Sequence, residues 1–150
     1  IRDSFISGFR GFSGSARYMG VLLSQYINRV TYYCDADTRC VEGLIDYGPQ
    51  DCVVVFGAER YSRMSCVLAQ IARDAHCRLI VITDKLTAPL AVGADIVLLA
   101  DFTSPTAVNS YLGVNFLVEA IAFEVSRQLG VFPQQRLSRM DHYLSELHLY

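Results

Sequence analysis

The sequence predicts an α/β fold in which a parallel sheet carries helices on both faces. Apolar runs of strand length alternate with amphipathic stretches of helix length, the pattern typical of parallel strands joined by helical crossovers. Hydrophobic residues make up 52% of the 150 residues and charged residues 19%, which is the composition of an ordered domain. One domain of this size buries about 70% of its unfolded surface, without needing a metal or a disulfide.

Five strands are expected, at residues 4–7, 30–34, 52–56, 79–83 and 96–99. The run at 52–56 is apolar throughout and rich in β-branched valine, which favours the centre of the sheet. The run at 4–7 ends at Gly8, where the chain turns toward the first helix. Along the chain, the expected strands and helices follow the order β-α-β-α-β-α-β-loop-β-α.

Five helices are expected as well, at residues 13–26, 39–46, 62–75, 106–129 and 134–149. Ser62 is a natural N-cap for the third helix, whose apolar residues fall on one stripe. Ser104-Pro105 suits the first turn of the long fourth helix, and Gly130 suits its end. The last stretch repeats apolar residues at i, i+3 and i+4, so it is suited to packing against the domain or a partner.

The composition argues against several classes of protein. The net charge is −2, and a single lysine, Lys85, stands among scattered arginines, so no continuous basic face is indicated for nucleic acid. The five cysteines are odd in number and form no C-x-x-C pair, which favours buried, reduced thiols over disulfides or a zinc cluster. No stretch approaches the roughly 20 apolar residues of a membrane span. We expect a cytoplasmic protein without metal or cofactor.

Three groups of loop residues are suited to a ligand, because ligands of open parallel sheets bind at the carboxyl ends of the strands, where helix N-termini offer amides to anions. The first loop, 8–15, is rich in glycine and serine. The second, 57–63, carries an arginine beside the Ser62 cap, suited to a phosphate or carboxylate. The third group joins 83–84 to the hydroxyls of 103–110. The predicted ligand-binding residues are Arg10, Gly11, Ser13, Ser15, Arg60, Ser62, Ser104 and Ser110.

Simpler explanations stay open for each group: a tight turn, a solvated arginine pair with an ordinary cap, and plain helix caps. The first loop does not match the G-x-G-x-x-G dinucleotide pattern, because Arg10 replaces the second glycine, and no G-K-[ST] follows. A mononucleotide P-loop is thereby excluded.

Catalytic residues are few. No histidine lies in a predicted ligand loop. Glu119, on the long helix, could act as a proton shuttle if it faced the ligand. Glu59, in the second loop, would repel a phosphate and is expected to point to solvent. The chain is therefore predicted not to be an enzyme.

Six segments, in this order and spacing, resemble the sugar isomerase (SIS) domain, and within it the ligand-sensing half of the RpiR family of transcriptional regulators. These segments are GFRG at 8–11, DCVVVF at 51–56 with RYSR at 60–63, ITD at 82–84, APL at 88–90, ADIVL at 94–98 and SP at 104–105. The resemblance covers about 5–129, and residues 136–150 look like the tail of such regulators.

The resemblance implies a flavodoxin-like, three-layer α/β/α sandwich with a five-stranded parallel sheet that dimerises through its helices. It also implies a phosphosugar held near the strand ends and the dimer interface. Many SIS domains read S-x-S-G-x-T in the second loop, whose hydroxyls hold the phosphate. Here Gly57, Glu59, Arg60 and Ser62 occupy the matching positions, so one hydroxyl remains, and Arg10 and Arg60 could supply replacement anion contacts.

We expect residues 1–130 to form the phosphosugar-binding domain and 131–150 a helical extension. The chain opens three residues before its first strand, so further residues are expected upstream, and in the family an N-terminal helix-turn-helix domain binds DNA. The leading hypothesis is an effector-binding domain, dimeric or tetrameric, that controls that missing domain. The alternatives are a sugar-phosphate isomerase using Glu119 and a ligand-free dimerisation domain.

Overall fold

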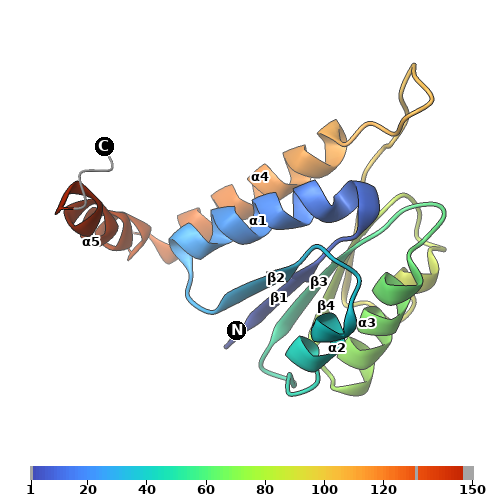
Figure 1. Ribbon diagram of the computed structural model, residues 1–150, viewed down its shortest axis with the longest axis horizontal. Coiled ribbons are helices and arrows are strands. Elements are labelled where there is room, and N and C mark those ends of the chain that lie inside the picture. Colours follow the sequence, from blue (N-terminus) through green and yellow to red (C-terminus); the bar gives the residue numbers. More distant parts are fainter. Residues whose placement is uncertain (1, 131, 147–150) are drawn as a thin grey trace.

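The computed structural model describes residues 2–130 and 132–146, and its sheet has the expected five strands. They are β1 (Ser4–Ser7), β2 (Val30–Tyr33), β3 (Cys52–Phe56), β4 (Arg78–Thr83) and β5 (Ile96–Leu99). All are parallel and lie in the order β2-β1-β3-β4-β5 (Figure 1). The predicted central position of 52–56 is confirmed.

Helices cover both faces of the sheet. The helices are α1 (Ser13–Tyr26), α2 (Thr38–Leu44), α3 (Arg63–Asp74), α4 (Leu112–Leu129) and α5 (Phe132–Glu146). One face is covered by α1 and α4, and the other by α2 and α3 (Figure 1). This is the predicted three-layer α/β/α sandwich. Within the described ranges, no helix combines the length and the apolar character needed to cross a bilayer.

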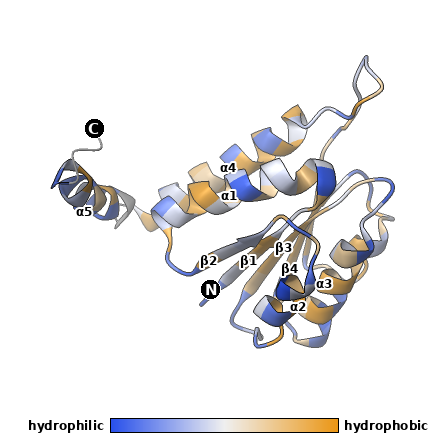
Figure 2. Cartoon of the chain, viewed as in Figure 1, coloured by the Kyte–Doolittle hydropathy of each residue, from blue (hydrophilic) through white to orange (hydrophobic). Residues whose placement is uncertain are grey.

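The core is built from both faces of β3. Every residue of β3 is buried, and alternate side chains point to opposite layers. Val53 and Val55 join the core under α2 and α3, whereas Val54 and Phe56 join the core under α1 and α4. Figure 2 shows the apolar residues concentrated on the central strands, with β2 at the sheet edge more polar. A strand buried on both faces therefore reads as the unbroken apolar run seen in the sequence.

The start of α4 differs from the prediction. The helix begins at Leu112 and not near residue 106. The hydroxyl of Ser104 accepts a hydrogen bond from the Thr106 amide, and the Ser110 amide donates to the Phe102 carbonyl at 3.1 Å. These short-range bonds close residues 102–110 into a loop, so the Ser-Pro pair opens a turn and not a helix. The other predicted boundaries agree to within about two residues.

The C-terminal helix α5 projects from one end of α1 and α4 (Figure 1). Arg136 ties it to the end of α1, because its guanidinium donates to the Ser24 carbonyl at 3.0 Å and to the Asn28 side chain. Residues 147–149 of the predicted helix lie outside the described residues.

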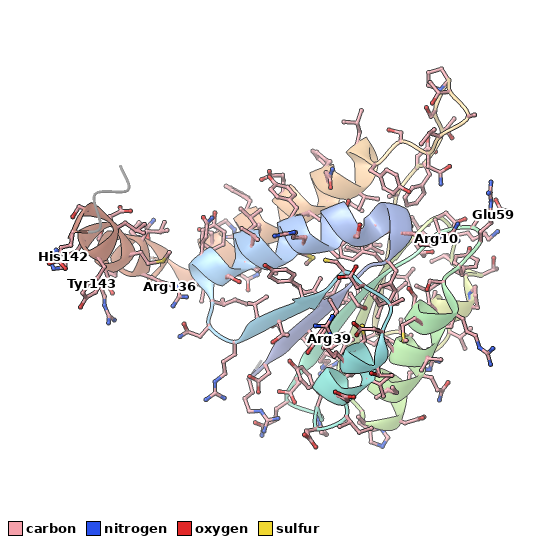
Figure 3. The ribbon with its side chains drawn as sticks, in the orientation of Figure 1. Arg10, Arg39, Glu59, Arg136, His142 and Tyr143 are labelled. Atoms are coloured by element: carbon pink, nitrogen blue, oxygen red, sulfur yellow. The ribbon has the colours of Figure 1, made fainter. Side chains whose placement is uncertain are left out.

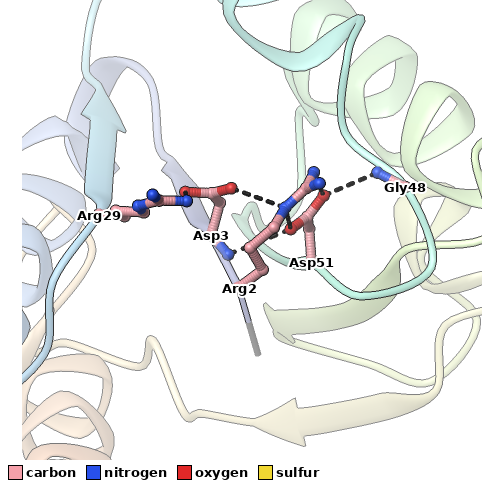
Figure 4. Close-up of polar contacts among 5 residues, drawn as sticks. All are labelled: Arg2, Asp3, Arg29, Gly48 and Asp51. Atoms are coloured by element: carbon pink, nitrogen blue, oxygen red, sulfur yellow. Dashed lines mark hydrogen bonds and ion pairs between the residues drawn. The ribbon is translucent and has the colours of Figure 1, made fainter.

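A buried carboxylate joins segments at the amino edge of the sheet, the end at which the parallel strands begin. The Asp51 side chain is fully buried and accepts hydrogen bonds from the Arg2 guanidinium and from the amides of Asp3 and Gly48 (Figure 4). Burial alone would raise the pKa of Asp51, but these donors outweigh it and hold the pKa below its ordinary value. Asp51 thus joins the chain before β1 to the turn before β3.

Candidate functional site

The topology marks one place at the carboxyl edge of the sheet for a ligand. Successive strands run from β1 outward to β2 and then from β3 through β4 to β5, so the strand order reverses between β1 and β3. Crevices of open α/β sheets form at such a reversal, outside the carboxyl ends of the strands. The loop from β1 to α1 and the loop from β3 to α3 flank it, and these are the two loops with the predicted arginines.

A cavity of about 550 Å³ lies at this reversal. This volume is within the range of small-molecule sites. Its lining comes from the two flanking loops and from the loop before α4: Phe9, Arg10, Gly11, Phe12, Phe56, Gly57, Ala58, Glu59, Arg60, Ser62, Ser65, Ala107, Val108, Asn109 and Tyr111. Four of the predicted ligand residues, Arg10, Gly11, Arg60 and Ser62, are brought together here.

Arg10 and Arg60 share an uncommon backbone conformation. Their φ angles are +59° and +65°, in the left-handed region that favours glycine. Both side chains are exposed, and within residues 2–130 and 132–146 neither makes an ion pair with a carboxylate. Figure 3 shows Arg10 and Glu59 at the same end of the molecule. Arg29 and His76 have similar φ angles away from this cavity, so the feature particular to Arg10 and Arg60 is that both line one cavity without a carboxylate partner among the described residues.

The start of α3 leaves donors free for an anion. Ser62 is at the N-cap position, but its side chain makes no capping hydrogen bond. The first amides of a helix have no partner within the helix, and the helix dipole adds partial positive charge at that end. The neighbouring Ser65 is buried and donates to the Phe56 carbonyl at 3.3 Å. The Ser62 hydroxyl and the first amides of α3 are thus suited to an anionic oxygen.

The other predicted ligand residues are outside the lining of this cavity. The hydroxyl of Ser13 donates to the Arg10 carbonyl at 2.8 Å, and the buried Ser15 donates to Asn115 at 2.8 Å. Ser104 bonds to Thr106, whereas Ser110 accepts from the Leu112 amide at 3.4 Å. All four side chains have partners within the chain, and ligand contact by them stays a prediction.

The two glutamates considered for catalysis are in different places. Glu59 is exposed, as expected, but it also lines the cavity. Glu119 is exposed on α4, where it accepts a hydrogen bond from the Tyr18 hydroxyl of α1, and it is absent from the cavity lining. The carboxylate that the isomerase hypothesis requires is therefore not at this cavity.

Tyr111 lines the cavity beside Asn109, although no local sequence pattern pointed to it. The Tyr111 ring packs edge-on against Phe12 at 5.2 Å between centroids. A Cβ atom at Gly11 would collide with the Tyr111 side chain. The signal available in the sequence was Gly11 itself, since a glycine in a loop permits close approach of another group.

The family comparison agrees with this geometry. The SIS domain family model matches residues 3–122. The chain belongs to the SIS domain family. A search of curated proteins finds no match.

Solved SIS structures show the same fold. The sugar isomerase domain of an RpiR transcription factor from Sphaerobacter thermophilus superposes with a TM-score of 0.88 at 20% identity, covering 94% of this chain and 80% of that one. The Vibrio vulnificus NanR protein, complexed with ManNAc-6P, gives a TM-score of 0.83 at 12% identity, covering all of this chain and 58% of that one.

Isomerases of this family also match. The hypothetical protein MJ1247 of Methanococcus jannaschii, for which a 3-hexulose-6-phosphate isomerase function is inferred, gives a TM-score of 0.72 at 12% identity. That match covers 93% of this SIS domain and 77% of the other chain. At these identities the likeness concerns the fold, which regulators and enzymes share.

Proposed function

We propose that this SIS domain is the effector-binding part of an RpiR-type transcriptional regulator, and that it binds a phosphosugar or a similar anionic metabolite. The observation that carries the proposal is that Arg10 and Arg60 line one cavity at the strand reversal and have no carboxylate partner in the described chain. The guanidinium groups are suited to grip phosphate oxygens through paired N–H donors. The Ser62 hydroxyl and the α3 amides add donors on the same side.

The comparison with NanR supports the choice of ligand class, since that structure contains a phosphorylated sugar derivative. The chain spans 58% of the NanR chain. We propose that residues 1–130 bind the effector, that 131–150 form a helical extension, and that a helix-turn-helix domain N-terminal to these residues contacts DNA. Ligand occupancy would then change DNA binding through a difference in affinity between two arrangements of the dimer.

We propose the outer face of α4 as the dimer contact. Leu112, Phe116 and Phe123 are each at least 70% exposed and are spaced to share one side of the helix, opposite the buried Val114 and Val118. Tyr18 and Val21 extend this apolar surface onto α1. Several exposed apolar side chains on neighbouring helices are typical of an interface.

The dimer contact is tested by Phe116→Glu. Light scattering after gel filtration should give the mass of a dimer for the parent chain and of a monomer for the variant. Leu86→Glu is the matched control, because Leu86 is 67% exposed but lies in the loop after β4. Dimers that survive Phe116→Glu would rule out this face.

The proposed location is the cytoplasm. The five cysteines are free thiols, and free thiols are typical of reducing compartments.

The ligand proposal is tested by a thermal-shift screen with sugar phosphates and small organic acids, followed by calorimetry. A ligand at 100 times its dissociation constant stabilises the folded state by about 2.7 kcal/mol. We expect Arg60→Ala and Ser62→Ala to weaken binding, and Glu119→Ala to leave it unchanged. Unchanged ligand affinity in both Arg60→Ala and Ser62→Ala would contradict the proposed site.

The same screen separates the two alternatives. Turnover of a sugar phosphate that is abolished by Glu119→Ala would establish an isomerase. No shift with any metabolite would favour a domain that only dimerises.

A further inference from the structure

The cavity-lining loop at 57–62 is bonded to the neighbouring strand at both of its ends. At its start, the Gly57 amide donates to the Ile82 carbonyl of β4 at 3.1 Å. Near its end, the Tyr61 hydroxyl donates to the Oδ1 atom of Asp84, the residue after β4, at 2.7 Å. Both bonds therefore join this loop to the carboxyl end of β4, which pairs with β3.

The residues between these two bonds have little to fix their shape. In the described chain, no backbone hydrogen bond joins residues 58–60 to another segment. Arg60 nevertheless has a φ angle of +65°, in the left-handed region that is unfavourable for a non-glycine residue. Such a conformation persists only where the surrounding structure fixes it. The bond made by the adjacent Tyr61 hydroxyl is placed to do so.

The Tyr61 ring is itself held on several sides. It is half-buried and packs against the core under α2 and α3. A Cβ atom at Gly57 would lie 3.9 Å from the ring, so the ring turns back toward the first residue of the loop. The Lys85 ammonium lies over the ring, 5.9 Å from its centroid, within the range of a cation–π interaction. The hydroxyl of Tyr61 therefore has a defined position.

Asp84 is arranged as the acceptor of this bond. Its Oδ1 atom also accepts from the Thr83 hydroxyl at 3.1 Å. Partial burial would raise the pKa of Asp84, but the bonds from Tyr61 and Thr83, together with Lys85, hold that pKa below its ordinary value. Burial and the bond to Asp84 raise the pKa of Tyr61. At neutral pH the donor is thus protonated and the acceptor ionised, the stronger kind of hydrogen bond.

We infer that Tyr61 and Asp84 are positioning residues for anion binding, because their bond fixes the loop that presents Arg60 and Ser62 to the cavity. This inference rests on the proposed function and adds two residues that act on the ligand through others. Neither Tyr61 nor Asp84 belongs to the lining of that cavity. Both hydroxyls donate to the one Oδ1 atom, so an asparagine at position 84 keeps the acceptor and loses only the charge.

The first test measures affinity by calorimetry on the full chain, with glucose 6-phosphate and inorganic phosphate as the probes. Tyr61→Phe removes only the hydroxyl and should weaken binding about 10-fold, the scale of one hydrogen bond to a charged group. Asp84→Ala should weaken binding to a similar extent, whereas Asp84→Asn should keep most of the affinity. Tyr47→Phe is the matched control, because Tyr47 is half-buried against the same core and outside the cavity lining.

The second test needs no ligand. Trypsin cleaves after arginine, and cleavage within a folded chain follows the fraction of time for which the segment is open. In Tyr61→Phe, cleavage after Arg60 should be roughly 10-fold faster than in the parent chain, the loss expected for one such bond. Cleavage after Arg10, which has a similar φ angle in the other loop, should be unchanged. Thermal unfolding of each variant confirms that it is folded at the temperature of both tests.

Two outcomes would overturn the inference and leave the proposed function intact. Unchanged affinity in Tyr61→Phe would mean that the loop keeps its shape without the hydroxyl. A loss in Asp84→Asn as large as that in Asp84→Ala would mean that the charge of Asp84, and not its oxygen, matters for binding.

Failure of the proposed function looks different, because then neither probe would bind in a way that depends on Arg60. The trypsin test still decides the inference in that case. Equal cleavage after Arg60 in Tyr61→Phe and in the parent chain would overturn the positioning role, and faster cleavage in the variant would support it.

Discussion

The arginines at the amino edge of the sheet have aspartate partners, whereas those at the carboxyl-edge cavity do not. At the amino edge, Arg2, Arg29 and Arg78 each lie within 4 Å of an aspartate, at 2.8, 3.8 and 3.4 Å. At the carboxyl edge, Arg10 and Arg60 have no such partner in the described chain. Charges that the chain neutralises itself serve to join its segments. Charges left unpaired around a cavity are available to a ligand.

The largest effect is expected at the amino edge, from Asp51→Ala. The change removes a fully buried carboxylate and leaves the Asp3 and Gly48 amides without an acceptor. A loss of about 3 kcal/mol is expected for breaking such a network. For a chain of this size that lowers Tm by roughly 6–12 °C in calorimetry.

Arg2→Ala is the control for this loss. The Arg2 side chain is 51% exposed, and the Asp3 and Gly48 amides still donate to Asp51 without it, so its removal should cost less than Asp51→Ala. Equal losses for the two variants would mean that Asp51 acts only through the ion pair and that its bonds to the amides contribute nothing.

The next largest effect is expected on ligand affinity, and it is measured by comparing Arg10→Ala at the carboxyl edge with Arg78→Ala at the amino edge. Both changes remove one positive charge. Arg10→Ala should weaken binding of a sugar phosphate about 10- to 100-fold, because it removes charged hydrogen bonds to the ligand. Arg78→Ala should leave affinity unchanged and cost less than about 1 kcal/mol of stability, since its pair with Asp95 is exposed.

Calorimetric titration of the two variants in one buffer makes this comparison. Equal losses of affinity would show that the arginines act only through the net charge of the molecule, and the contrast between the edges would then have no functional meaning.

A smaller effect is expected from pH. The pKa of Asp51 is lowered in the folded state, so its carboxylate stabilises the fold above its unfolded pKa of about 4. That contribution is lost as the pH falls through the folded pKa. Urea unfolding at pH 7 and at pH 3 should therefore show a gap between the parent chain and Asp51→Asn that narrows in acid. A gap independent of pH would argue against an ionised Asp51.

Much of the architecture could be predicted because its cause is local. The strands at 4–7 and 52–56 were predicted to the residue. The second of them is buried on both faces and therefore reads as a continuous apolar run. The start of α4 was missed because Ser104 and Thr106 bond to neighbouring amides, a choice that a Ser-Pro pair does not reveal. Serine and threonine side chains bond to nearby backbone amides both at helix N-termini and in loops, so these residue types do not distinguish the two.

The site could be predicted only in part. Arg10 and Arg60 followed from the rule that loops at strand ends meet at one edge. Ser15 looked equally suitable, but it is inside α1 and faces Asn115 of α4, a contact between residues 100 positions apart. Tyr111 reaches the cavity by the same kind of long-range packing. Such contacts depend on how the elements pack, which local patterns do not contain.

The smallest effect concerns the backbone at the carboxyl edge, through Arg60→Gly. A non-glycine residue in the left-handed region costs about 1–2 kcal/mol, and glycine loses about 0.5–1 kcal/mol through its freer unfolded state. Arg60→Gly should therefore raise stability by about 0.5 kcal/mol while it weakens ligand binding. His76→Gly is the matched control, because His76 has φ +56° and is exposed outside the cavity lining.

The two glycine variants should gain similar stability in urea unfolding, and only Arg60→Gly should lose affinity in calorimetry. A stability gain without an affinity loss at position 60 would mean that the strained arginine serves no ligand. A gain paired with a loss would mean that position 60 keeps a less stable backbone because the guanidinium there binds an anion, whereas the equally strained His76 at the amino edge has no such function.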